Sequence, residues 1–102
     1  MQAELTYGVV PRETLAAESG LSFLNGLIEG RHPAPPFSRT TAIYLIQAEA
    51  GRVVFTGVPS DAFFNPLGTI HGGWTAALLD SAMGCAVHST LHAGEAYTTV
   101  EM

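Results

Sequence analysis

The sequence predicts a single α+β domain, and three observations lead to that class. First, 47% of its 102 residues are hydrophobic and only 13% are charged, so there is enough apolar area to build a core. Second, residues 40–58 are rich in β-branched and aromatic side chains and are interrupted by Gly51, which predicts an antiparallel hairpin. Third, residues 71–89 are apolar apart from Asp80 and predict a long helix.

The first third of the chain predicts helices followed by a stiff connector. A helix is expected to begin at Pro11, because proline is tolerated in the first turn. After Ser19, apolar residues recur at helical spacing as far as Ile28, and Gly30 is placed to end that helix. The segment 32–36 holds three prolines and is expected to be extended, because each proline fixes its own φ and biases its predecessor away from helix.

The remaining elements follow from residue type and from breakers. Strands are expected at residues 40–48 and 52–58, and residues 60–70 are expected to form a loop. The helix at 71–89 comes next, and residues 97–102 are expected to open a third strand. No linker or repeat divides residues 1–102, so one domain is predicted, with a helical and proline-rich part (1–38) followed by the hairpin and long helix (39–102).

Charge and cysteine content exclude several classes of function. The four positive charges are all arginines, and nine acids give a net charge of −5, which excludes an electrostatic site for nucleic acid or an anionic membrane. One cysteine excludes an intrachain disulfide framework. Residues 1–10 lack the features of a signal peptide, and no uninterrupted apolar run is long enough to span a membrane, so a cytoplasmic protein is expected.

Asp80 is the only charged residue between Asp61 and Glu95. Apolar residues surround it on every side of the predicted helix, so this helix is expected to be enclosed by protein. A buried carboxylate is costly unless it is paired, protonated or solvated by a cleft. Asp80 is therefore either a structural group that caps a loop or pairs with an arginine, or a functional carboxylate; its position favours the second.

The sequence His71-Gly72-Gly73 opens the same helix. Unpaired N–H groups and the helix dipole at such an end can stabilise an oxyanion, although two glycines also suit a tight junction between loop and helix. Gly72 and Asp80 are eight residues apart, or roughly 12 Å along a helix, so one carbonyl cannot touch both. If both act on one substrate, two helices must pack antiparallel about a two-fold axis.

Residues 65–74 read Asn-Pro-Leu-Gly-Thr-Ile-His-Gly-Gly-Trp, and residues 77–86 read Ala-Leu-Leu-Asp-Ser-Ala-Met-Gly-Cys-Ala. This pattern resembles the hotdog-fold thioesterases, and within them the phenylacetic-acid-degradation branch related to 4-hydroxybenzoyl-CoA thioesterase. The resemblance spans roughly residues 19 to 102. It implies a long central helix wrapped by a curved antiparallel sheet, and an enzyme that hydrolyses acyl-CoA thioesters as a homodimer or homotetramer.

The resemblance also implies roles for individual residues. Asp80 would be the nucleophile or the general base, the Gly72 N–H would polarise the thioester carbonyl, and Asn65 would position the water or the thioester. His71 would order the loop through Asn65 or nearby backbone, and Thr99 or Thr98 would hold the water. The candidate substrate-binding residues are Gly73, Trp74, Phe64 and Met83. Trp74 and Phe63-Phe64 are equally open to a plain core role, which is the commoner one for large apolar residues.

A hotdog domain also needs two or three strands after Met102, so the chain is expected to be a fragment or to receive the remainder in another way. Coenzyme A enters as part of the substrate, no other cofactor and no metal is expected, and four arginines offer few groups for its phosphates. Cys85, His88 and His92 have a zinc-compatible spacing but lack a fourth ligand, and Cys85 as a nucleophile lacks an orienting group. The alternatives kept open are a hotdog hydratase or dehydratase and a non-catalytic acyl-CoA-binding module.

Overall fold

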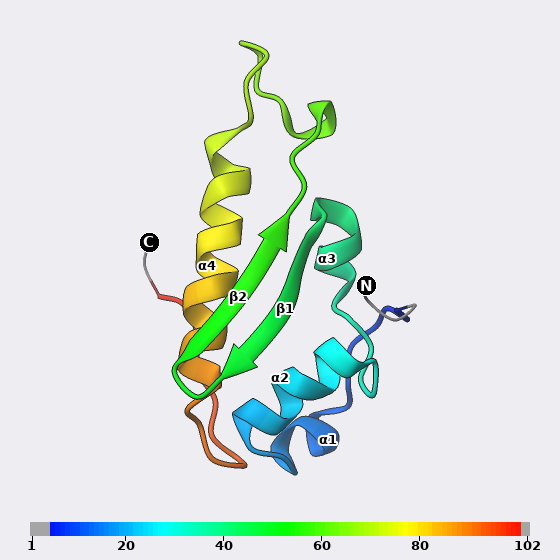
Figure 1. Ribbon diagram of the computed structural model, residues 1–102, viewed down its shortest axis with the longest axis vertical. Helices are drawn as coiled ribbons and strands as arrows, with labels where there is room; N and C mark the ends of the chain where they lie inside the picture. Colours follow the sequence, from blue (N-terminus) through cyan, green and yellow to red (C-terminus); the bar gives the residue numbers. More distant parts are fainter. Residues whose placement is uncertain (1–4, 101–102) are drawn as a thin grey trace.

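A computed structural model describes residues 5–100 and confirms the α+β class. Its elements in chain order are α1 (Arg12–Ala16), α2 (Gly20–Glu29), α3 (Pro36–Thr41), β1 (Ile43–Glu49), β2 (Arg52–Gly57), the 3₁₀ turn η1 (Asp61–Phe63) and α4 (Gly72–His88) (Figure 1). No helix among these residues is both long and apolar enough to cross a membrane.

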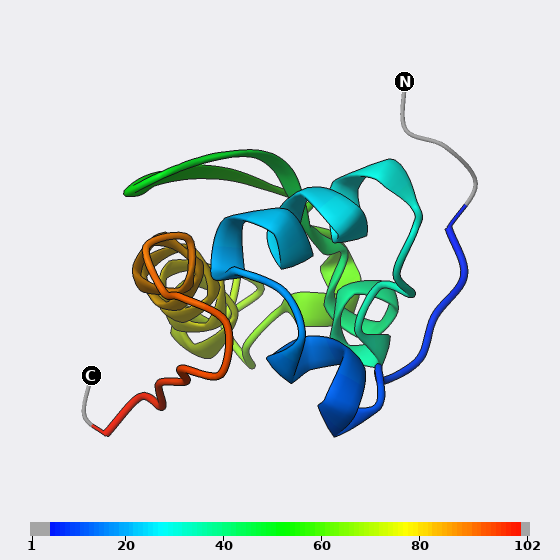
Figure 2. The same ribbon diagram turned by 90° about the horizontal axis from the view of Figure 1, so that it is seen from below.

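The hairpin forms a curved layer over one side of α4 (Figure 2), and α2 packs at the lower end of both in the view of Figure 1. Strands β1 and β2 pair antiparallel from Ile43–Gly57 to Glu49–Arg52, with one irregularity in register. Leu24 of α2 and Ile43 of β1 are the largest fully buried side chains. A long helix against an antiparallel sheet is the arrangement expected of a hotdog domain, and α2 packs against the C-terminal end of α4, where Phe23 contacts His88.

The boundaries of α2 are those expected from the sequence. Ser19 caps the helix, because its hydroxyl accepts a hydrogen bond from the Ser22 N–H at 3.2 Å. Gly30 ends it in the left-handed conformation, with φ 84°.

Two expectations for the next segment are wrong. Pro36 does not belong to the extended connector but begins α3, because proline suits the first helical position. Thr40 and Thr41 belong to the same helix instead of the first strand. Their hydroxyls donate to carbonyls four residues earlier, at 3.3 and 2.7 Å, so these β-branched side chains support a helical turn.

The prediction of a third strand is also wrong for the described residues, because residues 97–100 form no strand. Residues 101–102 lie outside the described residues. The segment 97–100 instead runs back along α4. An ideal Cβ on Gly84 would stand 2.6 Å from the Tyr97 hydroxyl oxygen, so the phenol packs directly on the backbone of α4. The absence of a side chain at Gly84 makes this contact possible.

Helix α4 begins and ends within a residue of the expected 71–89, but it is not enclosed by protein on every side. Leu79, Met83 and Val87 are 52%, 56% and 50% exposed. These residues recur every four positions and form one stripe. We call it the α4 stripe. The hairpin lies over one side of α4 (Figure 2), and the three side chains of the stripe stay half-exposed.

Gly20→Ala is expected to destabilise the fold strongly. A Cβ at Gly20 would stand 1.6 Å from the His88 carbonyl oxygen, and this neighbour is backbone that cannot turn aside. We expect a loss of at least about 1–3 kcal/mol in the free energy of unfolding, measured by urea denaturation. Gly72→Ala is the matched control, because a Cβ there meets nothing within 4 Å. Equal stability of the two variants would contradict the close packing of α2 on α4.

Candidate functional site

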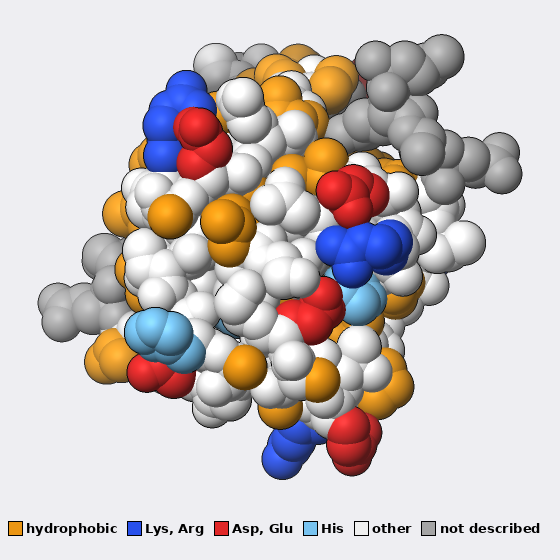
Figure 3. Space-filling model, turned by 60° about the horizontal axis from the view of Figure 1, so that its bottom comes forward, with side chains coloured by type: hydrophobic (Ala, Val, Ile, Leu, Met, Phe, Trp, Pro, Cys, Tyr) orange, Lys and Arg blue, Asp and Glu red, His pale blue; other side chains and the backbone are white. Residues whose placement is uncertain are grey.

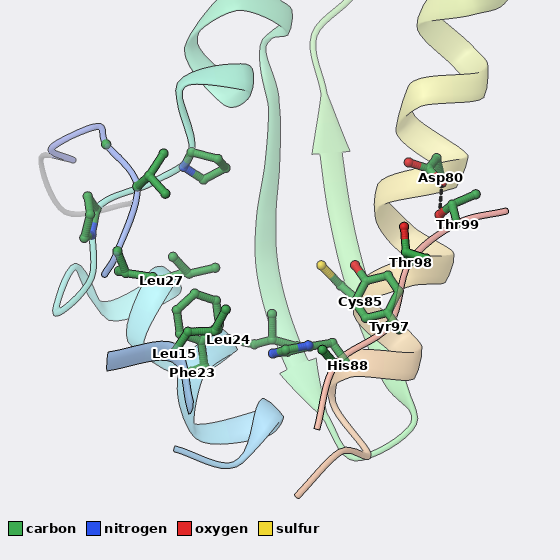
Figure 4. Close-up of a pocket in the computed structure, with 16 residues that line it drawn as sticks. Leu15, Phe23, Leu24, Leu27, Asp80, Cys85, His88, Tyr97, Thr98 and Thr99 are labelled. Atoms are coloured by element: carbon green, nitrogen blue, oxygen red, sulfur yellow. Dashed lines mark hydrogen bonds between the residues drawn. The ribbon is translucent and has the colours of Figure 1, made fainter. Parts of the chain in front are cut away.

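The structure places Thr99, in the segment that follows α4, against Asp80 in the middle of α4. The Thr99 hydroxyl donates a hydrogen bond to Asp80 Oδ1 at 2.7 Å (Figure 4). No other described residue bonds the carboxylate. Asp80 pairs with no arginine here, so the ion-pair alternative for this residue does not hold among residues 5–100.

Asp80 and Thr99 lie at the edge of a groove of about 620 Å³. Figure 4 shows α4 and the C-terminal segment on one side of it and the N-terminal helices on the other. Its lining is mostly apolar. The lining residues that the argument below uses are Leu15, Phe23, Leu24, Leu27, Cys85, His88 and Tyr97.

A second, smaller space of about 190 Å³ is lined by residues of α4, the hairpin, α3 and the segment before α3. Asp80 lines this space too, together with Leu27, Cys85 and Tyr97. The carboxylate therefore stands where the two spaces meet, with the larger one toward α2.

The titratable groups beside Asp80 are held uncharged by their surroundings. Burial, with a smaller contribution from the Asp80 charge, raises the pKa of the Cys85 thiol to about 11. Burial also lowers the pKa of His88 and raises that of Tyr97. At neutral pH Cys85 is a thiol, which argues against a cysteine nucleophile, because the thiolate is the reactive form.

The free energy of unfolding should fall as the pH rises through the range from about 9 to 11. The thiol of Cys85 loses its proton near its ordinary pKa of 9 in the unfolded chain and near 11 in the folded one. Between these values the folded state binds more protons, so raising the pH favours unfolding, by about 2 kcal/mol at pH ~10.5. Urea denaturation at about pH 8 and pH 10.5 measures this, with Cys85→Ala as control. An equal loss in the free energy of unfolding of Cys85→Ala would show that ionisation of tyrosines, and not of Cys85, causes the effect.

His71 and Gly72 lie at the N-terminal end of α4, away from Asp80 in its middle. His71 caps the helix, because its Nδ1 accepts from the Gly73 N–H at 2.8 Å, and its own N–H donates to the Phe63 carbonyl at 2.7 Å. A role of His71 in ordering a catalytic loop stays a prediction. No hydrogen bond joins the Gly72 N–H to another described residue, and the space around Gly72 is open.

The Asn65 side chain is engaged in its own loop. Its Oδ1 accepts from the N–H groups of Leu67 and Thr69, at 3.0 and 3.2 Å. Its Nδ2 donates to the Thr69 hydroxyl at 2.9 Å. To bind a thioester or its water, the amide nitrogen would have to share or release Thr69, so a role of Asn65 in the reaction stays a prediction.

Trp74 has the core role that the sequence left open. Its Nε1 donates to the Thr41 carbonyl at 2.8 Å, and its ring stacks on Phe63 with centroids 5.7 Å apart. Phe64 is 49% exposed and Met83 belongs to the α4 stripe. Gly73, Trp74, Phe64 and Met83 line neither of the two spaces beside Asp80.

The groove residues contributed by α2 were not among the candidates. The helical spacing of Phe23, Leu24 and Leu27 is visible in the sequence and indicates an apolar face, but it does not indicate what that face meets. Their partners on α4 lie about sixty residues away in the chain. Only the tertiary fold brings the two faces together.

Charged groups elsewhere in the described chain are mostly paired at short range. Arg31 bonds Glu29 at 2.8 Å, Arg52 lies 3.3 Å from Glu49, and the Arg39 guanidinium lies over the Tyr7 ring. Figure 3 shows basic and acidic side chains next to one another on one face of the molecule. No group of three His, Cys, Asp or Glu side chains within residues 5–100 is placed to hold a metal ion.

The family model of the thioesterase superfamily matches residues 67–102, roughly a third of the chain. The matched segment contains Gly72, Asp80 and Thr99, and it leaves out Asn65 and the α2 side of the groove. No curated protein and no solved structure matches the chain. Over these residues the chain is similar to the thioesterase superfamily.

Proposed function

We propose that this chain hydrolyses the thioester of an aromatic or medium-chain acyl-CoA, releasing the free acid and coenzyme A. One observation carries the proposal: a carboxylate hydrogen-bonded to a threonine hydroxyl stands at the edge of an apolar groove, within the segment that resembles thioesterases. Such a carboxylate supplies a nucleophile or a base beside a place for an acyl group.

The chemistry follows from the carboxylate. Thr99 fixes Asp80 through Oδ1 and leaves Oδ2 without a partner among the described residues. As a general base, Asp80 takes a proton from water, and the resulting hydroxide attacks the carbonyl carbon. The C–S bond then breaks, and the thiolate leaves and takes up a proton. As a nucleophile, Asp80 would itself attack that carbon and expel the thiolate, which takes up a proton, and water would then hydrolyse the resulting anhydride.

The oxyanion donor in this proposal comes from a second copy of the chain. The Gly72 N–H, at the N-terminus of α4, has no hydrogen-bond partner among the described residues, and it lies roughly 12 Å along α4 from its own Asp80. Bringing Gly72 of one copy to Asp80 of the other requires two α4 helices to pack antiparallel, with Ala76 of each near the two-fold axis. Each dimer would then hold two composite sites.

The test is release of free thiol from aromatic and aliphatic acyl-CoAs, followed with a thiol reagent. Release well above the uncatalysed rate supports hydrolysis. Turnover of an enoyl-CoA to its hydrated product without release of thiol would replace the proposal by a hydratase. Tight binding of acyl-CoA with neither product would replace it by a binding module.

A further inference from the structure

We infer that the groove between α2 and α4 holds the acyl group of the substrate, and that it selects uncharged, apolar acyl groups whose length Phe23 and Leu27 limit. The inference rests on the proposed function for the reaction itself. It assigns specificity to α2 and not to Trp74, Phe64 or Met83, which lie outside the groove.

The acyl group is placed in this groove because the groove is continuous with the carboxylate of Asp80. Asp80 and Thr99 line the same groove as Leu15, Leu24 and Leu27, so a carbonyl carbon at Asp80 has its acyl carbons directed along apolar walls. The volume of about 620 Å³ lies within the range of small-molecule sites. Across the groove, Phe23 meets the edge of His88, and His88 meets the edge of Tyr97, at centroid distances of 5.7 and 5.8 Å. This row of rings forms one wall.

The charges around the groove exclude an acidic acyl group. None of the four arginines lines it, and among the described residues the only charged side chain in its lining is the carboxylate of Asp80. Burial lowers the pKa of His88, which keeps that imidazole neutral. A second carboxylate on the acyl chain would find no cation and would be repelled by Asp80.

The test compares straight-chain acyl-CoAs of increasing length in the wild-type protein and two variants. In the wild type, kcat/KM should rise about fourfold for each methylene until the groove is full. Leu27→Phe adds three carbons to the wall and should lower kcat/KM for the longest substrates about 15- to 60-fold, with short ones unchanged. Phe23→Ala should move the optimum to longer chains. The control is Ile28→Phe, the neighbouring residue on α2, which lines neither space.

A charge comparison tests the second half of the inference. Hexanoyl-CoA and adipoyl-CoA differ by a terminal carboxylate, and we expect adipoyl-CoA to be turned over at least about 100-fold less well. Equal turnover of the two, or chain-length profiles that are the same in wild type, Leu27→Phe and Phe23→Ala, would overturn the inference while leaving hydrolysis in place.

Failure of the proposed function gives a different result. If no acyl-CoA releases thiol, titration calorimetry with 1-octanol, an uncharged chain that Asp80 does not repel, tests the groove directly. Binding that Leu27→Phe weakens and Ile28→Phe leaves unchanged supports an acyl groove without hydrolysis. Absent binding, or equal binding by all three proteins, overturns the inference together with the function.

Discussion

Asp80→Asn should lower kcat for thiol release by about 10²–10⁴-fold and leave the fold intact. An amide has the shape of the carboxylate and can still accept the 2.7 Å hydrogen bond from Thr99, so the local packing is kept. It cannot take a proton from water, and its oxygen is a poor nucleophile. The loss should therefore appear in kcat, measured on the best acyl-CoA of the panel, with little change in the thermal midpoint.

Asp61→Asn is the matched control for this variant. Asp61 is an exposed carboxylate in η1 and lines neither space beside Asp80, so the same chemical change there should leave kcat within about twofold. Activity of Asp80→Asn within tenfold of wild type, in a folded protein, would remove Asp80 from the reaction. The thioesterase proposal would then need another carboxylate or fail.

Helix α4 could be predicted closely because several signals in the sequence agree. Residues 71–89 are apolar with one charge, two glycines follow a histidine, and that histidine caps the helix. Local signals of this kind act within a few residues and are readable without the fold. The separation of Gly72 from Asp80 follows from helix geometry alone, and the observed continuous helix keeps it.

The expectations that failed depend on contacts between distant residues or on competing local bonds. Thr40 and Thr41 have high strand propensity, but their hydroxyls bond the preceding helical turn. Tyr97 reads as the start of a strand, but Gly84 lets its ring pack on α4. The groove between α2 and α4 depends on the contact of Phe23 with His88, and no local pattern in the sequence indicates that these two residues meet.

Gly72→Pro should lower kcat by about 10²–10³-fold, the loss typical of removing one oxyanion donor. Proline removes the N–H and is favoured at the first position of a helix. The preceding residue, His71, already has ψ 133°, the extended conformation that a following proline requires. Stability should therefore be unchanged or slightly raised. Gly72→Ala keeps the N–H, meets nothing within 4 Å, and should retain full activity. Equal activity of the two variants would contradict an oxyanion role for this N–H.

The same variants decide whether the site is shared between two copies. In a dimer formed from one Asp80→Asn chain and one Gly72→Pro chain, one composite site keeps both Asp80 and the Gly72 N–H, and the other keeps neither. Equal amounts of the two inactive proteins, unfolded and refolded together, give heterodimers in about half of the dimers, each with one working site. The mixture should regain about a quarter of the wild-type activity. A mixture as inactive as its components would place both groups in one chain, where roughly 12 Å of helix keeps them apart, and would contradict the composite site.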